Sequence, residues 1–368
     1  MVKEIWTGAI LNFSGIMFKQ NQIIFIGPKF TLPKGGIAFV LSEYHKLFPD
    51  SYFVASTISK NKLTKIVGFI FGITKLLFLL ISKKDIKIVH IHGASYNSFK
   101  RKRIIHSICK LFNKQTIYHI HGGGYQEFYL NSCEKKKRKI ASLINNTDCL
   151  ICLSESWKVF FTNNFSPKRI EIIPNIIAAP NQKQENHKNT KPLVFQFLGF
   201  IDGPKGVWLL LETIKQHKQE LLGKVVFNIG GNGKTDKLQR LIKEYRLEEI
   251  VFYNGWVSGK LKQQLLNDAD VYILPSYNEG LPISILEAMS YSLPILSTSV
   301  GGIPEIVSDD NGILIEPGDK TQLWTAIEYF IYANKSILNK MGQISKGKAK
   351  PHLPDEVEKK LIKLYKTI

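Results

Sequence analysis

The sequence predicts an α/β protein made of two Rossmann-like, doubly wound parallel-sheet domains that face a cleft. Short apolar runs alternate with segments long enough for crossover helices, which is the pattern of a parallel sheet wound by helices. This pattern stops at a polar stretch and then starts again. Compact domains usually hold about 100 to 200 residues, so a chain of 368 residues fits two of them.

The first domain is predicted over residues 1–178. Residues 1–20 precede its first strand and are interpreted as an extension or as the result of an early start codon. Six apolar runs predict its strands, at residues 22–27, 51–55, 86–92, 116–120, 148–153 and 170–173.

Residues 179–192 are predicted to link the two domains, because they are polar, contain two prolines and lack an apolar period. The second domain is predicted over residues 193–345. A terminal amphipathic helix is expected within residues 346–368, crossing back to the first domain. Six apolar runs predict the second sheet, at residues 192–199, 224–230, 250–255, 270–275, 294–298 and 312–315.

Positive charge is concentrated in the first half of the chain. Residues 1–175 carry 26 basic and 9 acidic side chains, a net charge of +17, whereas the remainder carries 24 and 21. The runs Lys100–Arg103 and Lys135–Lys139 each begin a predicted helix. Such asymmetry favours a partner with negative charge, either lipid headgroups or nucleic acid, although solvated surface lysines would give the same count. Nucleic acid is disfavoured because the runs lack interleaved aromatic residues.

The apolar and charged fractions, 44% and 22%, exclude disordered and fibrous classes. Cys149 and Cys152 have the spacing of a metal knuckle, but they lie in an apolar strand that points them to opposite faces, so we expect buried thiols and no zinc. No secretory signal opens the chain, so we expect a reducing cytoplasm. The 16-residue apolar segment 66–81 is shorter than the roughly 20 residues of a bilayer span. It is interpreted as a helix packed on a sheet or lying in a membrane interface.

The strongest chemical pattern lies between residues 275 and 287, after a predicted strand. Glu279 and Glu287 flank a Gly-Leu-Pro-Ile turn that opens a helix. Helix-start amide groups bind phosphates, and carboxylates accept hydrogen bonds from sugar hydroxyls. Acidic residues that complement a helix dipole would explain Glu279 alone but not the whole run.

This spacing of the two glutamates resembles the retaining glycosyltransferases of family 4, which have the GT-B fold. Three further segments agree in order and position: Gly199–Gly206, Ile173–Asn175 and Val300–Val307. The resemblance extends from about residue 22 to the end of the chain, and it implies that the first domain, residues 1–178, binds the acceptor of the reaction.

The resemblance implies a role for each matching position. Lys205 would contact the donor diphosphate, Glu279 the transferred sugar and Glu287 the ribose. His121 would contact the primary hydroxyl of the sugar, the alternative being a buried structural histidine. Lys205 and helix-start amides can stabilise the leaving nucleoside diphosphate, so neither a metal ion nor a cofactor is expected. The remaining expected contacts with the donor are Gly35, Gly36, Gly206, Trp256, Val257, Gly280, Leu281, Pro282 and Ile283.

One position departs from the family pattern, since Phe200 stands where the family usually places a diphosphate-binding arginine. The resemblance and the basic first domain together imply retaining transfer of a hexosyl unit from UDP- or GDP-sugar to a lipid-linked glycan, for surface lipopolysaccharide or capsule. The enzyme is expected at the cytoplasmic face of the inner membrane, in peripheral contact with anionic lipid. The alternatives are a nucleotide-sugar epimerase of the same architecture and a non-catalytic subunit that binds sugar nucleotides.

Overall fold

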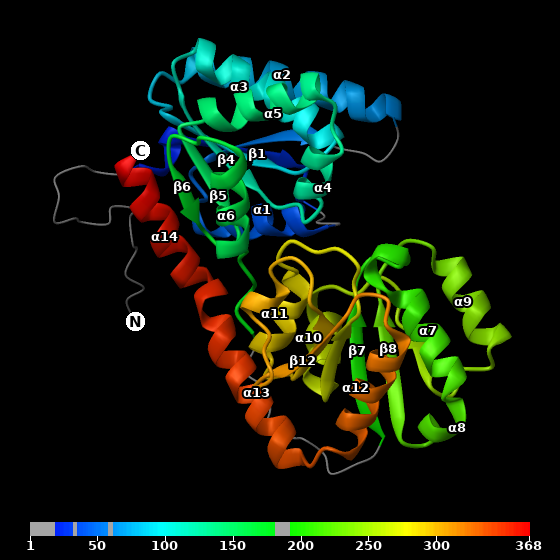
Figure 1. Cartoon of the computed structure of the whole chain (residues 1–368). Coiled ribbons are helices and arrows are strands. Elements are labelled where there is room, and N and C mark those ends of the chain that lie inside the picture. The colour runs from blue at the N-terminus through cyan, green and yellow to red at the C-terminus, as the bar shows by residue number, and fades with distance from the viewer. Residues whose placement is uncertain (1–18, 32–34, 58–61, 181–191) are drawn as a thin grey trace. The chain divides into compact units, whose positions relative to one another are not determined.

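In a computed structural model the chain forms two compact units. Unit 1 comprises Met1–Ile176 together with Pro354–Ile368, and unit 2 comprises Ile177–Leu353. The structure describes residues 19–31, 35–57, 62–180 and 192–368 (Figure 1). The predicted extension at residues 1–20 and linker at residues 179–192 therefore fall almost wholly outside the described residues.

Unit 1 is built on a six-stranded sheet in the order β2-β1-β3-β4-β5-β6, with every neighbouring pair parallel. Each strand coincides with an apolar run of the sequence, so the predicted strands of this half are confirmed. The direction of winding reverses between β1 and β3. The strands are β1 (Ile23–Pro28), β2 (Tyr52–Thr57), β3 (Ile88–Gly93), β4 (Gln115–Ile120), β5 (Cys149–Cys152) and β6 (Ile170–Ile172).

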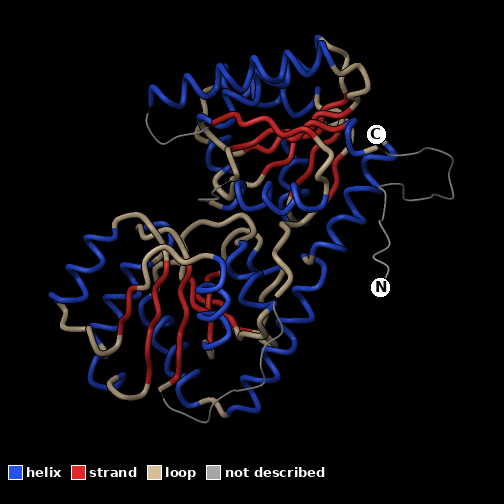
Figure 2. Tube along the Cα trace, turned by 180° about the vertical axis from the view of Figure 1, so that it is seen from behind, coloured by secondary structure: helices blue, strands red, loops and turns tan. Residues whose placement is uncertain are grey.

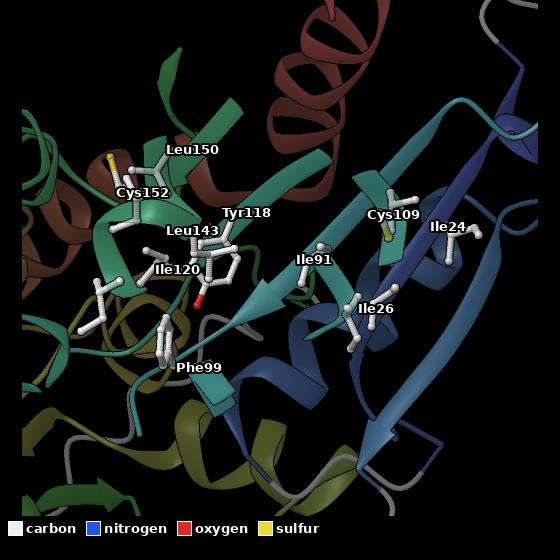
Figure 3. Packing of buried hydrophobic residues seen from close by; sticks show 14 of the residues in the cluster. Ile24, Ile26, Ile91, Phe99, Cys109, Tyr118, Ile120, Leu143, Leu150 and Cys152 are labelled. Atoms are coloured by element: carbon white, nitrogen blue, oxygen red, sulfur yellow. The ribbon is translucent and has the colours of Figure 1, made fainter. Parts of the chain in front are cut away.

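Alternate residues of these strands face two different sets of helices. Ile24, Ile26 and Ile91 point into one core (Figure 3), which they share with apolar residues of α2 (Lys62–Ser82), α3 (Asn97–Leu111), α4 (Tyr125–Leu130), α5 (Glu134–Asn146) and α6 (Glu155–Asn164). On the opposite face Phe25 packs against Tyr44 of α1 (Gly36–Leu47), with ring centroids 5.7 Å apart. The sheet is therefore covered on both sides, as the alternation of helices and strands predicts.

Unit 2 repeats this architecture with a second parallel sheet in the order β12-β11-β10-β7-β8-β9. Its six strands also coincide with the predicted runs: β7 (Leu193–Leu198), β8 (Val225–Gly230), β9 (Val251–Tyr253), β10 (Val271–Leu274), β11 (Ile295–Thr298) and β12 (Gly312–Ile315). The helices between and after them are α7 (Val207–Gln216), α8 (Lys218–Leu221), α9 (Thr235–Glu244), α10 (Gly259–Asp268), α11 (Ile283–Ser290), α12 (Lys320–Tyr332) and α13 (Lys335–Ala349). In this strand order the winding reverses between β7 and β10.

The last helix, α14 (Pro354–Thr367), belongs to unit 1 although the residues before it belong to unit 2. Tyr365 of α14 lies with its hydroxyl 2.7 Å from Nδ1 of His90 on β3. Residues 346–349, predicted as part of the returning segment, instead complete α13. The helix that returns is therefore shorter than the predicted segment.

The apolar segment 66–81 forms most of α2, the long helix in light blue in Figure 1 and one of the blue coils in Figure 2. One side of α2 packs on the sheet so closely that a Cβ on Gly72 would lie 2.3 Å from the carbonyl oxygen of Ala55. Residues 64–82 are long and apolar enough to cross a membrane, and 28% of the most apolar window is buried within unit 1. Packing on the sheet, one of the two predicted arrangements, is confirmed for one face of the helix.

Candidate active site

Lys205, Gly206 and Glu279 of unit 2 come from the loops after β7 and β10, which are neighbours in the sheet. Ligands of open parallel sheets bind beyond the carboxyl ends of the strands at the point where the winding reverses. Lys205 follows β7 and Glu279 follows β10, so the two loops flank this point. Residues separated by 74 positions in the sequence are thereby brought into contact.

The Lys205 loop is held against the end of β10 by backbone contacts. Asp202 caps a short 3-10 turn by accepting a hydrogen bond of 2.8 Å from the amide of Gly203. Gly206 has φ of 72°, and a Cβ there would lie 1.8 Å from the carbonyl oxygen of Pro275. Only glycine tolerates both the left-handed backbone and this approach. Gly206 thus fixes the position of the backbone at Lys205, from which the lysine side chain extends.

Glu279 is buried, with 8% of its surface exposed. Its Oε1 lies 2.5 Å from the ammonium of Lys205 and accepts a hydrogen bond of 2.8 Å from the hydroxyl of Ser276. The Gly-Gly turn supports this loop, because the amide of Gly302 donates to the carbonyl of Gly280 at 2.6 Å. A Cβ on Gly301, where φ is 57°, would lie 2.0 Å from the carbonyl oxygen of Glu279. The third matching segment of the sequence therefore holds the first glutamate in place.

Glu287 lies on α11 and forms the second ion pair of the site. The ammonium of Lys262, on α10, lies 2.5 Å from Glu287 Oε1, and the two side chains are 23% and 9% exposed. Pro282 is the N-cap of α11, so Gly280 and Leu281 lie directly before the helix and Ile283 is its first residue. Amide groups in the first turn of a helix have no acceptor within the helix itself. The sequence analysis missed Lys262, because no spacing pattern marks a lysine that reaches its partner from a neighbouring helix.

The two candidates of the loop after β9 differ in exposure. Trp256 is 43% exposed, whereas Val257 is buried. A Cβ on Gly230 would lie 2.6 Å from Val257, so this valine packs against the end of β8. Trp256 is therefore the residue of the pair that a ligand can reach, and Val257 positions its loop.

Phe200, the departure from the family pattern, is half-exposed beside the Lys205 loop. A positive charge is nevertheless present there, because Lys234 Nζ lies 2.9 Å from Asp202 Oδ1. This ammonium and the amide of Gly203 lower the pKa of the Asp202 carboxyl. Lys234 is thus a basic group close to the position of the missing arginine.

Gly35 and Gly36 lie in unit 1, where they open α1 after β1. Gly35 has φ of 131°, and a Cβ there would meet no atom within 4 Å. A side chain at this position would therefore be opposed by backbone strain and not by lack of space. The neighbouring residues 32–34 lie outside the described part of the chain.

His121, also in unit 1, follows β4, and its ring lies between two polar partners. Nδ1 is 3.1 Å from Oδ1 of Asn175, and Nε2 is 2.9 Å from Nδ1 of His92. Burial lowers the pKa of His121 to about 4, while the contact with Asn175 acts in the opposite direction. With both nitrogens engaged, the ring would have to exchange His92 for a sugar hydroxyl to take the predicted role.

His121 belongs to a cluster of four stacked histidines that the sequence analysis did not predict. Parallel pairing of β3 and β4 sets His92 beside His119, and alternation along each strand brings His90 and His121 to the same face. Three of them, His90, His92 and His119, place ligand atoms within 4.8 Å of one another, as a metal site would. However, both ring nitrogens of His90 are already engaged, with Tyr365 and with His119.

The chain matches two family descriptions, Glycosyl transferases group 1 over residues 179–348 and Glycosyltransferase Family 4 over residues 40–179. With both domains matched, the chain belongs to the family 4 glycosyltransferases. The fold class and the resemblance inferred from the sequence are thereby confirmed, and the chain is a glycosyltransferase with the GT-B type of architecture. Donor, acceptor and stereochemistry do not follow from family membership.

Relatives of this glycosyltransferase occur in bacteria and eukaryotes. It is 26% identical to an uncharacterised 41.2 kDa protein of the cps region of Klebsiella pneumoniae, over 79% of this chain and 85% of that protein. It is 24% identical to the GPI3 subunit of phosphatidylinositol N-acetylglucosaminyltransferase from Saccharomyces cerevisiae, covering 78% of this chain but 65% of that subunit. A stretch of 140 residues is 34% identical to the colanic acid biosynthesis glycosyltransferase WcaL of Escherichia coli, covering 36% of this chain and 34% of WcaL.

Solved structures share the fold at low identity. Sucrose-phosphate synthase from Thermosynechococcus elongatus has a TM-score of 0.77 at 17% identity, covering 94% of this chain and 98% of that one. Anabaena HepE, in complex with UDP-glucose, has a TM-score of 0.74 at 16% identity, covering 94% and 99%. These neighbours support the two-domain architecture.

Proposed function

We propose that this glycosyltransferase moves a hexosyl unit from UDP- or GDP-sugar to a lipid-linked glycan, with retention of configuration and without a metal ion. The observation that carries the proposal is the pair of Lys–Glu contacts beside the point where the winding of the second sheet reverses. Lys205 with Glu279 places a cation and an acceptor in the loops before α11, and Lys262 with Glu287 places a second pair on the helix itself.

In the proposed mechanism the donor diphosphate replaces Glu279 as the ion-pair partner of the Lys205 ammonium. The ammonium and the opening amides of α11 then stabilise the charge that develops on the leaving nucleoside diphosphate. Glu279, released from the lysine, accepts hydrogen bonds from hydroxyls of the transferred sugar, and Glu287 accepts them from the ribose. The leaving phosphate helps to deprotonate the acceptor on the same face of the sugar, which retains the configuration.

The known proteins support this proposal without deciding the substrates. HepE is described in complex with UDP-glucose, and S. aureus TarM in complex with UDP and alpha-GlcNAc-glycerol. The Klebsiella relative comes from a cps region, and WcaL from colanic acid biosynthesis. These names are consistent with a role in assembling a surface polysaccharide, and the proposal places this role at the cytoplasmic face of the inner membrane.

The test is donor binding followed by product analysis. A panel of UDP- and GDP-sugars, with and without EDTA, should raise the melting temperature for one nucleotide series, since a ligand at 100 times its Kd stabilises the fold by about 3 kcal/mol. EDTA should leave that shift unchanged. Transfer to a lipid-linked acceptor with an α linkage is the expected product, whereas sugar inversion without acceptor would indicate an epimerase. Binding without any turnover would indicate a non-catalytic subunit.

A further inference from the structure

The helix α2 carries an apolar stripe on the side that faces away from the sheet. The residues of this stripe are between 50% and 67% exposed: Ile66, Val67, Ile70, Phe71, Phe78 and Ile81. Their spacing keeps them on one side of a helix with 3.6 residues per turn. Large apolar side chains gathered in this way mark an interaction surface on a protein, whereas single exposed ones do not.

The opposite side of α2 is fixed in the core of unit 1. Leu76, Leu79 and Leu80 are buried in the cluster shared with the sheet, and Gly72 lies against the backbone of β2. A helix that crossed a bilayer would have to remove these leucines from that core. We therefore interpret α2 as a helix that stays on the sheet and offers its outer face to a partner.

A basic groove lies on the same face of the sheet, between α3 and α5. Its volume is about 960 Å³, and five of the residues lining it are basic: Arg103, Lys110, Lys135, Arg138 and Lys139. No aspartate or glutamate lines it among the described residues, although Lys110 also pairs with Asp148 at 2.7 Å. The helices α2, α3 and α5 all pack into one core cluster and cover the same face of the sheet (Figures 1 and 2), so the apolar stripe and the groove belong to one layer of helices of unit 1.

We propose that this surface binds an anionic phospholipid bilayer, with the exposed stripe of α2 inserted among the lipid chains near the headgroups and lipid phosphates in the groove. Apolar insertion combined with basic side chains is the arrangement that favours anionic membranes. A second copy of the chain fits less well, because a symmetric dimer through this surface would bring two basic grooves towards each other. The inference deepens the proposed function and rests on it, since a lipid-linked acceptor requires a membrane at unit 1.

The test is co-sedimentation of the full chain with vesicles of phosphatidylglycerol and phosphatidylcholine, compared with vesicles of phosphatidylcholine alone. The wild type should sediment with the anionic vesicles only. The double variant Phe71→Ser/Phe78→Ser should lose about tenfold or more in vesicle affinity, because two exposed aromatic rings no longer insert. Tyr332→Ser is the matched control, since Tyr332 is equally exposed, at 70%, but lies in unit 2. It should bind like the wild type.

The groove is tested separately with Arg138→Glu/Lys139→Glu, which should abolish the preference for phosphatidylglycerol. Equal binding of wild type and Phe71→Ser/Phe78→Ser, or dimerisation of the wild type through α2 without vesicle binding, would overturn the proposal. The rise in melting temperature on adding donor should be measured for the same proteins, because it tests the proposed reaction independently of membrane binding. If the stabilisation persists while vesicle binding is absent in the wild type, the membrane surface is wrong and the proposed reaction stands.

Discussion

The two units share one architecture but treat their buried polar groups in opposite ways. In unit 2 each buried glutamate of the site contacts a lysine at 2.5 Å. In unit 1 four imidazoles on one face of β3 and β4 contact one another, and the nearby buried Lys102 donates a hydrogen bond of 2.5 Å to Oγ of Ser56. Burial lowers the pKa of Lys102 and of these histidines, which favours their neutral forms.

This difference indicates what each unit can bind. A lysine held by a carboxylate is a cation already in place, and an arriving phosphate can replace the carboxylate as its partner. A cluster of neutral imidazoles offers no such charge, and it resists protonation because a charged ring would have to be buried. The charged chemistry of the reaction therefore belongs to unit 2, and the predictions below test this separation.

The largest effect is expected from Lys205→Ala. Removing one preorganised group that stabilises developing charge typically costs about 10²- to 10³-fold in kcat, and we expect this loss in sugar transfer with saturating donor. Lys348→Ala is the matched control, because Lys348 also pairs with a carboxylate of unit 2, Asp310 at 2.9 Å, but outside the candidate site. It should change kcat by less than about threefold, as exposed pairs contribute little. Full turnover by Lys205→Ala would remove this residue from the mechanism.

The second prediction is a loss of folding stability at acidic pH, caused by the histidine cluster of unit 1. Burial lowers the pKa of His121 to about 4 and the pKa of His90, His92 and His119 well below 6.5. Between pH 6.5 and 4 the unfolded chain therefore binds protons that the folded chain does not, so stability falls as the pH falls, by about 1 kcal/mol per pH unit for each histidine. This stability is fully present above pH 6.5.

Hydrogen exchange can locate this loss of stability. After correction for intrinsic rates, amides of β3 and β4 should lose protection between pH 7 and pH 5, while those of β10 and β11 should change less. His45→Gln, which alters an exposed histidine of unit 1 outside the cluster, should leave the pH dependence unchanged. Equal loss of protection in both sheets would show that the cluster does not set the acid sensitivity.

The sequence predicted the fold well because the fold depends on apolar periodicity. Parallel strands that are buried on both faces appear as continuous apolar runs, and all twelve were recognised. The loop between Pro275 and Glu287 was recognised because its residues are consecutive. Lys205 and Glu279 were named separately, but their contact depends on which strands become neighbours.

What the sequence did not reveal depends on three-dimensional packing. Lys262 reaches Glu287 only because α10 lies beside α11. His92 lies beside His119, 27 residues further along the chain, only because of the register in which β3 pairs with β4. The basic run Lys100–Arg103 was interpreted as one charged surface, yet Lys102 is buried beside Ser56. Charge counts along a helix do not distinguish the face that packs inward.

A smaller effect is expected from Glu287→Gln. If Glu287 holds the ribose in both the ground state and the transition state, its loss should raise the KM for the donor and the Kd for the nucleoside diphosphate about tenfold, with kcat nearly unchanged. Calorimetry and steady-state kinetics would measure the two quantities. Glu316→Gln, at an exposed glutamate of unit 2, is the control. A fall in kcat without a change in KM would instead place Glu287 at the reacting sugar.

The smallest effect, and the only gain, is expected from Phe200→Arg. Phe200 is 48% exposed, so an arginine fits without disturbing the core, and its guanidinium would restore a charged contact beside Lys205. Hydrogen bonds to charged groups contribute about 1.5 to 3 kcal/mol. Because ordering and desolvating the arginine side chain offsets part of this, we expect up to about tenfold tighter binding of the nucleoside diphosphate.

Phe252→Arg is the matched control for this gain. Phe252 is 44% exposed on β9 of the same unit, so the substitution adds the same charge at a different place. Titration calorimetry at two salt concentrations should show tighter binding only for Phe200→Arg, with the gain reduced at high salt. If both variants gain equally, the improvement reflects the overall charge of unit 2 and not a contact at this position. If neither gains, Lys205, Lys234 and the α11 amides already satisfy the diphosphate, and the missing arginine costs the enzyme nothing.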